Sequence, residues 1–114
     1  MTPLPDQEFF EALILRHMDD RLQKVPEKVV IWFSASWCGP CKRVDSAALM
    51  ESFPDVTFYK CDVDENHYTP GFCSVRSIPA FLAIHKGAIA GPLFQNSNTE
   101  AILHWIAGVF QPQK

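Results

Sequence analysis

The sequence has no long hydrophobic run and no cluster of charges of one sign. Its 114 residues include 10 Lys and Arg and 13 Asp and Glu, interspersed along the chain, for a formal net charge of -3. Such a mixture does not attract nucleic acid or anionic lipid through bulk charge. No apolar stretch approaches the length of a membrane-spanning helix. We therefore expect no nucleic-acid partner and no membrane partner.

The sequence also lacks a recognisable export or targeting segment, because residues 1–11 carry acids and prolines where such a segment needs basic residues. We therefore expect a cytoplasmic or nuclear protein. Neither a phosphate-binding loop nor a dinucleotide fingerprint occurs, so we expect no bound cofactor. Repeats and low-complexity tracts are absent as well. With 47% hydrophobic and 20% charged residues, the chain has the composition of one globular domain over residues 1–114.

The first half of the chain predicts a helix followed by a βαβ unit. Asp6 is the expected N-cap of a helix that ends within residues 20–24 and has an apolar stripe of Phe10, Ile14, Met18 and Leu22. Residues 29–33 are β-branched or aromatic, which is typical of a central strand buried on both faces. Residues 38–52 have helical spacing, and residues 56–61 predict a second strand. Since a helix separates the two strands, we expect them to be parallel.

The second half predicts a short helix, a hairpin and a final helix. Thr69 and Pro70 suit the start of the short helix. Residues 80–85 and 88–94 flank a turn signal at positions 86 and 87, which favours an antiparallel hairpin at the edge of the sheet. Residues 97–100 match a capping box, and the helix after them has an apolar face of Ile102, Trp105, Ile106, Val109 and Phe110.

Two of the four cysteines, Cys38 and Cys41, are three residues apart where the central strand gives way to a helix. In a chain without an export signal this spacing indicates redox chemistry or metal binding. Unpaired N–H groups and the macrodipole at a helix N-terminus favour an anion, so Cys38 is the expected nucleophile. A stabilisation of about 1 to 2 kcal/mol would lower its thiol pKa by roughly one unit from about 8.5. Cys41, one turn further on and more sheltered, is the expected resolving thiol.

The segment from Trp37 to Lys42, Trp-Cys-Gly-Pro-Cys-Lys, closely resembles the active-site signature of the thioredoxin family. Residues 75–79 resemble the segment that ends in a cis-proline beside that active site, and residues 60–64 resemble the family's third strand. The resemblance covers residues 29–110. It implies an α/β thioredoxin fold with a central mixed sheet of four to five strands and helices on both faces. It also implies a thiol-disulfide oxidoreductase that acts as a protein-disulfide reductase on partner proteins.

The resemblance further implies what surrounds the dithiol. Trp37 would shield one side of it, Gly39 would let a partner approach, and Pro40 would bias the pair towards reducing chemistry. Ile78 and Pro79 would present an apolar ledge that pairs with an extended substrate segment.

Lys42 completes the motif, and Gln95 occupies a position near the partner groove that is often glycine in the family. The implied electron donor is a flavoprotein thioredoxin reductase, and we expect the protein to be a monomer.

One departure from the family concerns the resolving step. Trp32 occupies the position of a buried aspartate that is commonly assigned to help deprotonate the resolving thiol, and Lys60 would then lose its usual partner. Trp32 itself is predicted to fill core volume. We hypothesise that resolution by Cys41 depends on water or another group and is slow near neutral pH.

Other interpretations of the cysteines stay open at this point. Cys73 is either a regulatory thiol that can be oxidised or an inert residue, and Cys61 is predicted to be buried and inert. A zinc site made of all four thiols is disfavoured because the second pair lacks compact ligand spacing, so we expect no metal. The alternative function is a thioredoxin-fold binding or assembly module in which the dithiol is secondary.

Overall fold

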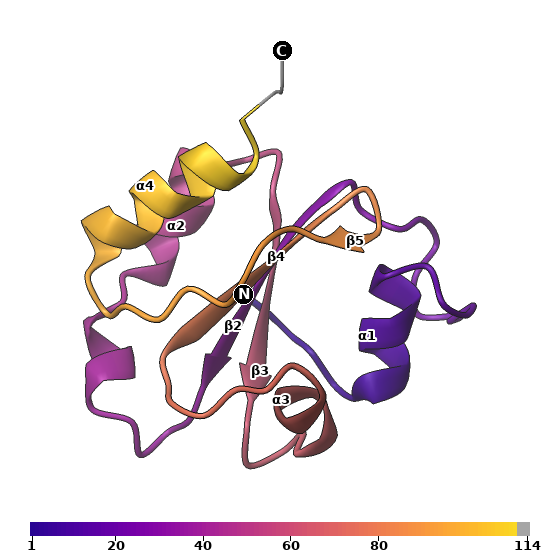
Figure 1. Ribbon diagram of the computed structural model, residues 1–114, viewed down its shortest axis with the longest axis horizontal. Coiled ribbons are helices and arrows are strands. Elements are labelled where there is room, and N and C mark those ends of the chain that lie inside the picture. The colour runs from indigo at the N-terminus through magenta and orange to yellow at the C-terminus, as the bar shows by residue number, and fades with distance from the viewer. Residues whose placement is uncertain (112–114) are drawn as a thin grey trace.

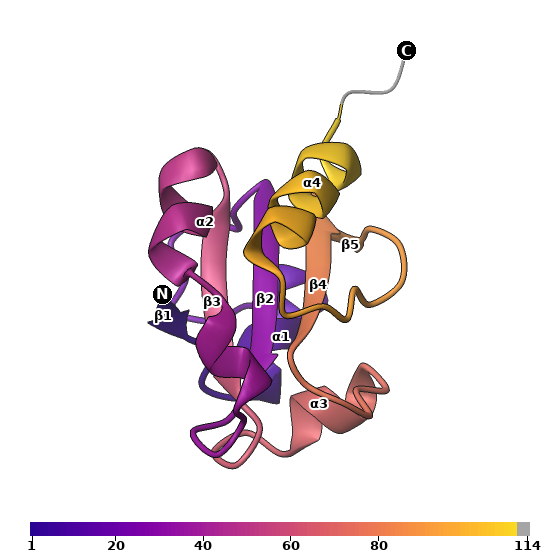
Figure 2. The ribbon, with the colours of Figure 1, turned by 90° about the vertical axis from the view of Figure 1, so that its left-hand side faces the viewer.

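The computed structural model describes residues 1–111, in which a five-stranded sheet lies between two layers of helices (Figure 1). The last three residues of the predicted domain, 112–114, lie outside this range. The strands lie side by side in the order β1-β3-β2-β4-β5, which Figure 2 shows across the page. Their bounds are Thr2–Pro3 for β1, Lys28–Ser34 for β2, Thr57–Asp62 for β3, Ala80–His85 for β4 and Ala88–Ile89 for β5.

The central strand is β2, as predicted. It pairs in parallel with β3 and antiparallel with β4, so the sheet is mixed and the predicted fold class is confirmed. Successive side chains of a strand point to opposite faces. Trp32 accordingly packs in the cluster beneath α2 (Ser46–Ser52) and α4 (Thr99–Val109), whereas Phe33 packs in the cluster beneath α1 (Gln7–Leu13). The buried run of β2 therefore serves two cores, one on each face.

The first helix is much shorter than the periodicity predicts. Asp6 caps α1 by accepting the N–H of Phe9 at 3.0 Å, but the helix ends at Leu13. The next residues turn away, so the predicted helix is wrong beyond this point: Met18 is 93% exposed, although Leu22 still packs against the core beneath α1.

Two long-range contacts direct this turn. The Leu15 side chain fills the space that a Cβ at Gly87 would need, and Gly87 has a φ of +80° that suits glycine. Arg21 donates to Asp6 at 2.9 Å and so ties the loop back to the start of α1.

The helix predicted over residues 38–52 is broken into two pieces. A 3₁₀ turn, η1, covers Pro40–Arg43, and α2 begins only at Ser46. Between them Val44 is extended and buried. Asp45 accepts the N–H of Ala48 at 3.0 Å and so acts as the N-cap of α2. The break follows from residue chemistry, because a short acidic side chain is more favourable at an N-cap than inside a helix.

Two helix starts differ from their predictions, the first by two residues and the second by one. The short helix α3 covers Tyr68–Phe72, so Thr69 lies inside it, buried and bonded to the Asn66 side chain at 2.9 Å. The last helix is capped by Asn98, which accepts the N–H of Ala101 at 2.9 Å, and not by Ser97. The predicted apolar face of α4 is confirmed, with Ile102 and Ile106 buried in its centre.

The two edges of the sheet are short strands. The hairpin is antiparallel and lies at the edge, as predicted, but β5 has only two residues and the chain rejoins β4 through a bridge between Phe81 and Phe94. At the other edge β1, which the pattern did not predict, pairs in parallel with β3.

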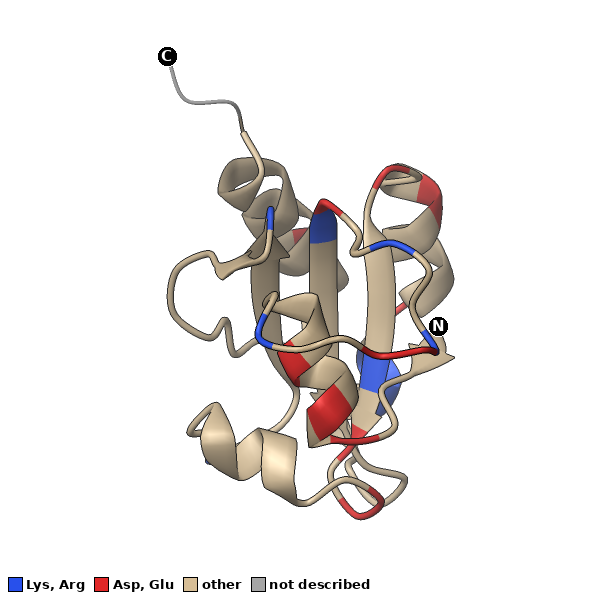
Figure 3. Ribbon diagram, turned by 90° about the vertical axis from the view of Figure 1, so that its right-hand side faces the viewer, with Lys and Arg blue, Asp and Glu red and all other residues tan. Residues whose placement is uncertain are grey.

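Figure 3 shows basic and acidic residues mixed over the face that carries α1. Among residues 1–111, no helix is both long enough and apolar enough to span a bilayer.

Candidate active site

The two cysteines of the motif lie just beyond the end of β2 and are joined as a disulfide. Their Cα atoms are 5.3 Å apart. The N–H of Cys38 donates to the carbonyl of Ala35 at 3.2 Å, which holds the loop between the strand and η1. Both cysteines are buried to the same extent, with 3% exposure each, so the prediction that Cys41 is the more sheltered of the two is wrong.

The sulfur of Cys38 faces a local hydrogen-bond donor. The N–H of Cys41 donates to Cys38 Sγ at 3.2 Å. Because η1 has four residues and stops before α2, the predicted stabilisation by the dipole of a long helix is replaced by this single N–H. A donor aimed at sulfur stabilises a thiolate more than a thiol. The two cysteines are therefore equally exposed, but Cys38 Sγ is the sulfur that receives a backbone N–H.

A second loop completes the site. The peptide bond between Ile78 and Pro79 is cis, as the resemblance predicts, and the carbonyl oxygen of Ile78 lies 3.7 Å from Cys38 Sγ. Beside this contact is a hollow of about 380 Å³ lined by Trp37, Val63, Pro70, Val75, Arg76, Ser77 and Ile78. Gln95 is exposed next to the Phe81–Phe94 bridge and does not line the hollow.

The remaining motif residues form the rim of the dithiol. Trp37 is 67% exposed, and its indole N–H donates to Asp64 Oδ2 at 2.8 Å. A Cβ added to Gly39 would meet nothing within 4 Å, so that side is open. Pro40 begins η1, and Lys42 is exposed. Asp64 was not predicted as a site residue, because its contact with Trp37 spans 27 positions.

Comparison with known proteins agrees with this geometry. The Thioredoxin family model matches residues 11–108. This chain belongs to the thioredoxin family. Like the family's other members it is a thiol-disulfide oxidoreductase, and the Cys38–Cys41 disulfide is its redox-active pair.

Similar thioredoxins occur in Geodia cydonium and Saccharomyces cerevisiae. Thioredoxin of Geodia cydonium is 40% identical over 83 residues, which are 70% of this chain and 78% of that protein. Mitochondrial thioredoxin-3 of Saccharomyces cerevisiae is 40% identical over 74 residues, which are 63% of this chain and 58% of that protein. The crystal structure of that yeast thioredoxin in its oxidised form has a TM-score of 0.80 at 34% identity, covering 95% of this chain and 94% of the yeast chain.

Within this thioredoxin, Trp32 lies in the same buried cluster as the two cysteines. It is 5% exposed and stacks on Phe81 with 6.0 Å between ring centroids. No Asp or Glu is buried among residues 1–111, and within the same range the indole N–H of Trp32 has no hydrogen-bond partner. Trp32 therefore fills core volume, as predicted, and supplies no proton acceptor.

Within the described part of the chain, Lys60 contacts the aromatic ring of Trp32 and not a carboxylate. Lys60 pairs in register with Trp32 on the neighbouring strand, and its Nζ lies 4.8 Å from the centroid of the Trp32 ring. An ammonium over an indole face at an exposed site stabilises by about 0.5–1 kcal/mol. Lys60 therefore contacts the Trp32 ring in the place where the family's aspartate would be its partner.

The other two cysteines lie on the opposite face of the sheet, in the cluster beneath α1. Burial raises the pKa of Cys61 to about 12 and that of Cys73, which is half-buried, to about 11. Both thiols are therefore protonated at neutral pH, which favours the inert interpretation of Cys73. Since the four thiols belong to two clusters on opposite faces, they do not form one zinc site.

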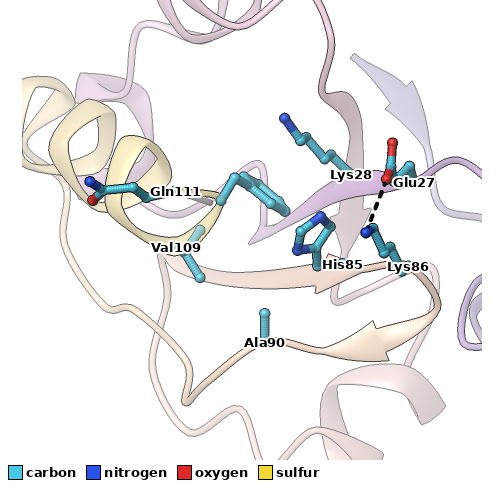
Figure 4. A pocket seen from close by; sticks show the side chains of 8 residues that line it. Glu27, Lys28, His85, Lys86, Ala90, Val109 and Gln111 are labelled. Carbon is cyan, nitrogen blue, oxygen red and sulfur yellow. Dashed lines mark ion pairs between the residues drawn. The ribbon is translucent and has the colours of Figure 1, made fainter. Parts of the chain in front are cut away.

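A larger hollow, of about 670 Å³, lies at the far end of the sheet, where β2 begins and β4 ends (Figure 4). Its ionic groups are already paired: Lys86 Nζ lies 3.7 Å from Glu27 Oε1, and Lys28 binds Asp55 at 2.8 Å. The ring of His85 meets Phe110 edge to face. No cysteine lines this hollow, so the chemistry of the protein belongs to the other end of the sheet.

Proposed function

We propose that this thioredoxin reduces disulfides in other proteins, with Cys38 as the attacking thiol and Cys41 as the resolving thiol. The Cys38 thiolate bonds to one sulfur of the target disulfide, and the other target sulfur leaves as a thiolate. Cys41 then loses its proton and attacks Cys38 Sγ, which closes the Cys38–Cys41 disulfide and releases the second target sulfur. The target gains the two electrons that the dithiol loses.

The observation that carries this assignment is the N–H of Cys41, which points at Cys38 Sγ and at no other sulfur. It favours the thiolate at Cys38 and leaves Cys41 to act second. Cys38 Sγ also lies beside the carbonyl of Ile78, which lines the hollow. The space over Gly39 is open, so a target segment has room to approach there.

The chain has no dinucleotide fingerprint, so its electrons come from another protein. We propose a flavoprotein thioredoxin reductase as this donor, and a monomer in the cytoplasm or nucleus as the working form. The mixture of basic and acidic residues on the side shown in Figure 3 supports a protein without a nucleic-acid partner.

A stoichiometric transfer tests the proposal. The protein is reduced with dithiothreitol, freed of reductant and mixed with excess insulin at pH 7. We expect each molecule to reduce one insulin disulfide, so that two new insulin thiols are alkylated and Cys38–Cys41 is oxidised. Cys73→Ser should give the same stoichiometry, because Cys73 lies in the other cluster. A dithiol that stays reduced, with no new insulin thiols, would show that the proposal is wrong.

A further inference from the structure

The hollow near the dithiol has a mostly apolar lining with one serine and one cation. Arg76 is the only ionisable side chain among the residues that line it. It is exposed, and within residues 1–111 it takes part in no ion pair. Arg21, Lys28 and Lys86, by contrast, each have a carboxylate partner. Arg76 is therefore an unpaired guanidinium at the hollow that Ile78 also lines, and it is free to bind a carboxylate from outside.

The backbone of the same loop also has free donors. The N–H groups of Arg76, Ser77 and Ile78 donate to no backbone carbonyl within residues 1–111. The main chain of an extended peptide can satisfy such donors, while its side chains enter neighbouring pockets. These donors lie close to the reaction centre, because the carbonyl oxygen of Ile78 in the same loop is 3.7 Å from Cys38 Sγ.

We propose that Arg76 selects extended target segments that carry an acidic side chain next to the reacting cysteine. This inference rests on the proposed function, because it concerns the proteins whose disulfides Cys38 attacks. The apolar walls of the hollow accept uncharged neighbours of that cysteine, and Arg76 pairs with the carboxylate. Asp64 at the rim is already bound by the Trp37 indole, and its charge disfavours an acid on that side.

Matched peptides test this selection. Three peptides each carry one cysteine as a mixed disulfide with 5-thio-2-nitrobenzoate, and they differ only in the residue next to the cysteine, which is Glu, Gln or Lys. Attack of Cys38 on the peptide sulfur releases the coloured thiolate and gives a second-order rate constant. We expect the Glu peptide to react about fivefold faster than the Lys peptide at low salt, the size typical of exposed charge pairs. High salt should shrink this ratio.

Variants that change the charge at position 76 test whether Arg76 causes the difference in rate between the Glu and Lys peptides. Arg76→Gln should bring the Glu-to-Lys ratio close to one, and Arg76→Glu should invert it. Lys24→Gln removes the same charge from an exposed position outside the hollow and should leave the ratio unchanged. A ratio near one in the parent protein, or one that survives Arg76→Gln, would overturn the inference while the proposed function stands. If the Gln peptide also failed to react, the proposed function would fail with it.

Discussion

Replacing Cys38 with serine is expected to reduce insulin-disulfide turnover to the rate of dithiothreitol alone, a loss of at least about a hundredfold in the protein-dependent rate. A serine hydroxyl is not ionised at neutral pH and forms no mixed disulfide, so the first exchange step is lost. The substitution changes one buried atom, and the Cys41 N–H can still donate to the serine oxygen, so the fold should persist. Turnover is followed by the turbidity of the free insulin B chain.

A matched variant separates this effect from general damage to thiols. Cys73→Ser, on the opposite face, should keep the parent rate. Full turnover in Cys38→Ser would mean that another thiol is the nucleophile. If the parent protein itself gave no acceleration over dithiothreitol, the alternative of a binding or assembly module with a secondary dithiol would be preferred.

The second large effect concerns Trp32. Trp32→Asp is expected to speed the release of a mixed disulfide by Cys41 at least about tenfold near neutral pH, because a carboxylate in this cluster can accept the Cys41 proton. In the parent no carboxylate is buried within residues 1–111, and the unpartnered indole N–H of Trp32 accepts no proton. Removing the large ring, which stacks on Phe81, should at the same time lower the free energy of unfolding by about 3–5 kcal/mol.

The control for this experiment is Trp32→Asn, which leaves a cavity of similar size without a base. The mixed disulfide with an insulin chain is mixed rapidly with buffer at pH 7, and release of the chain is followed in quenched samples. Urea unfolding checks that both variants are folded at the temperature used. Resolution that is no faster in Trp32→Asp than in the parent, or equally fast in Trp32→Asn, would contradict the hypothesis of a missing proton acceptor.

The central strand and the dithiol could be predicted because local residues determine them. The β-branched and aromatic run of β2 is buried whichever face it presents, and the cysteine spacing is visible in the chain. The end of α1 could not be predicted in the same way. It depends on Leu15 packing over Gly87 and on Arg21 binding Asp6, contacts between positions far apart in the chain.

The break between η1 and α2 was missed for a different reason. The apolar residues on both sides of Asp45 keep helical spacing, so periodicity alone predicts one continuous helix. Asp45 is itself the signal that periodicity overlooks, because this residue type is a strong N-cap. The contacts of Trp32 with Lys60 and of Trp37 with Asp64 needed the strand register and the loop geometry, which sequence spacing does not provide.

A disulfide trap tests dithiol exchange most directly. Cys41→Ser removes the resolving thiol, so a reduced sample mixed with insulin should accumulate a covalent complex that dithiothreitol dissolves. We expect peptide mass spectrometry to place the bond at Cys38. The raised pKa values of Cys61 and Cys73 keep those thiols out of the reaction at neutral pH. A complex bonded through Cys61 or Cys73, or no complex at all, would contradict the assignment of Cys38 as the attacking thiol.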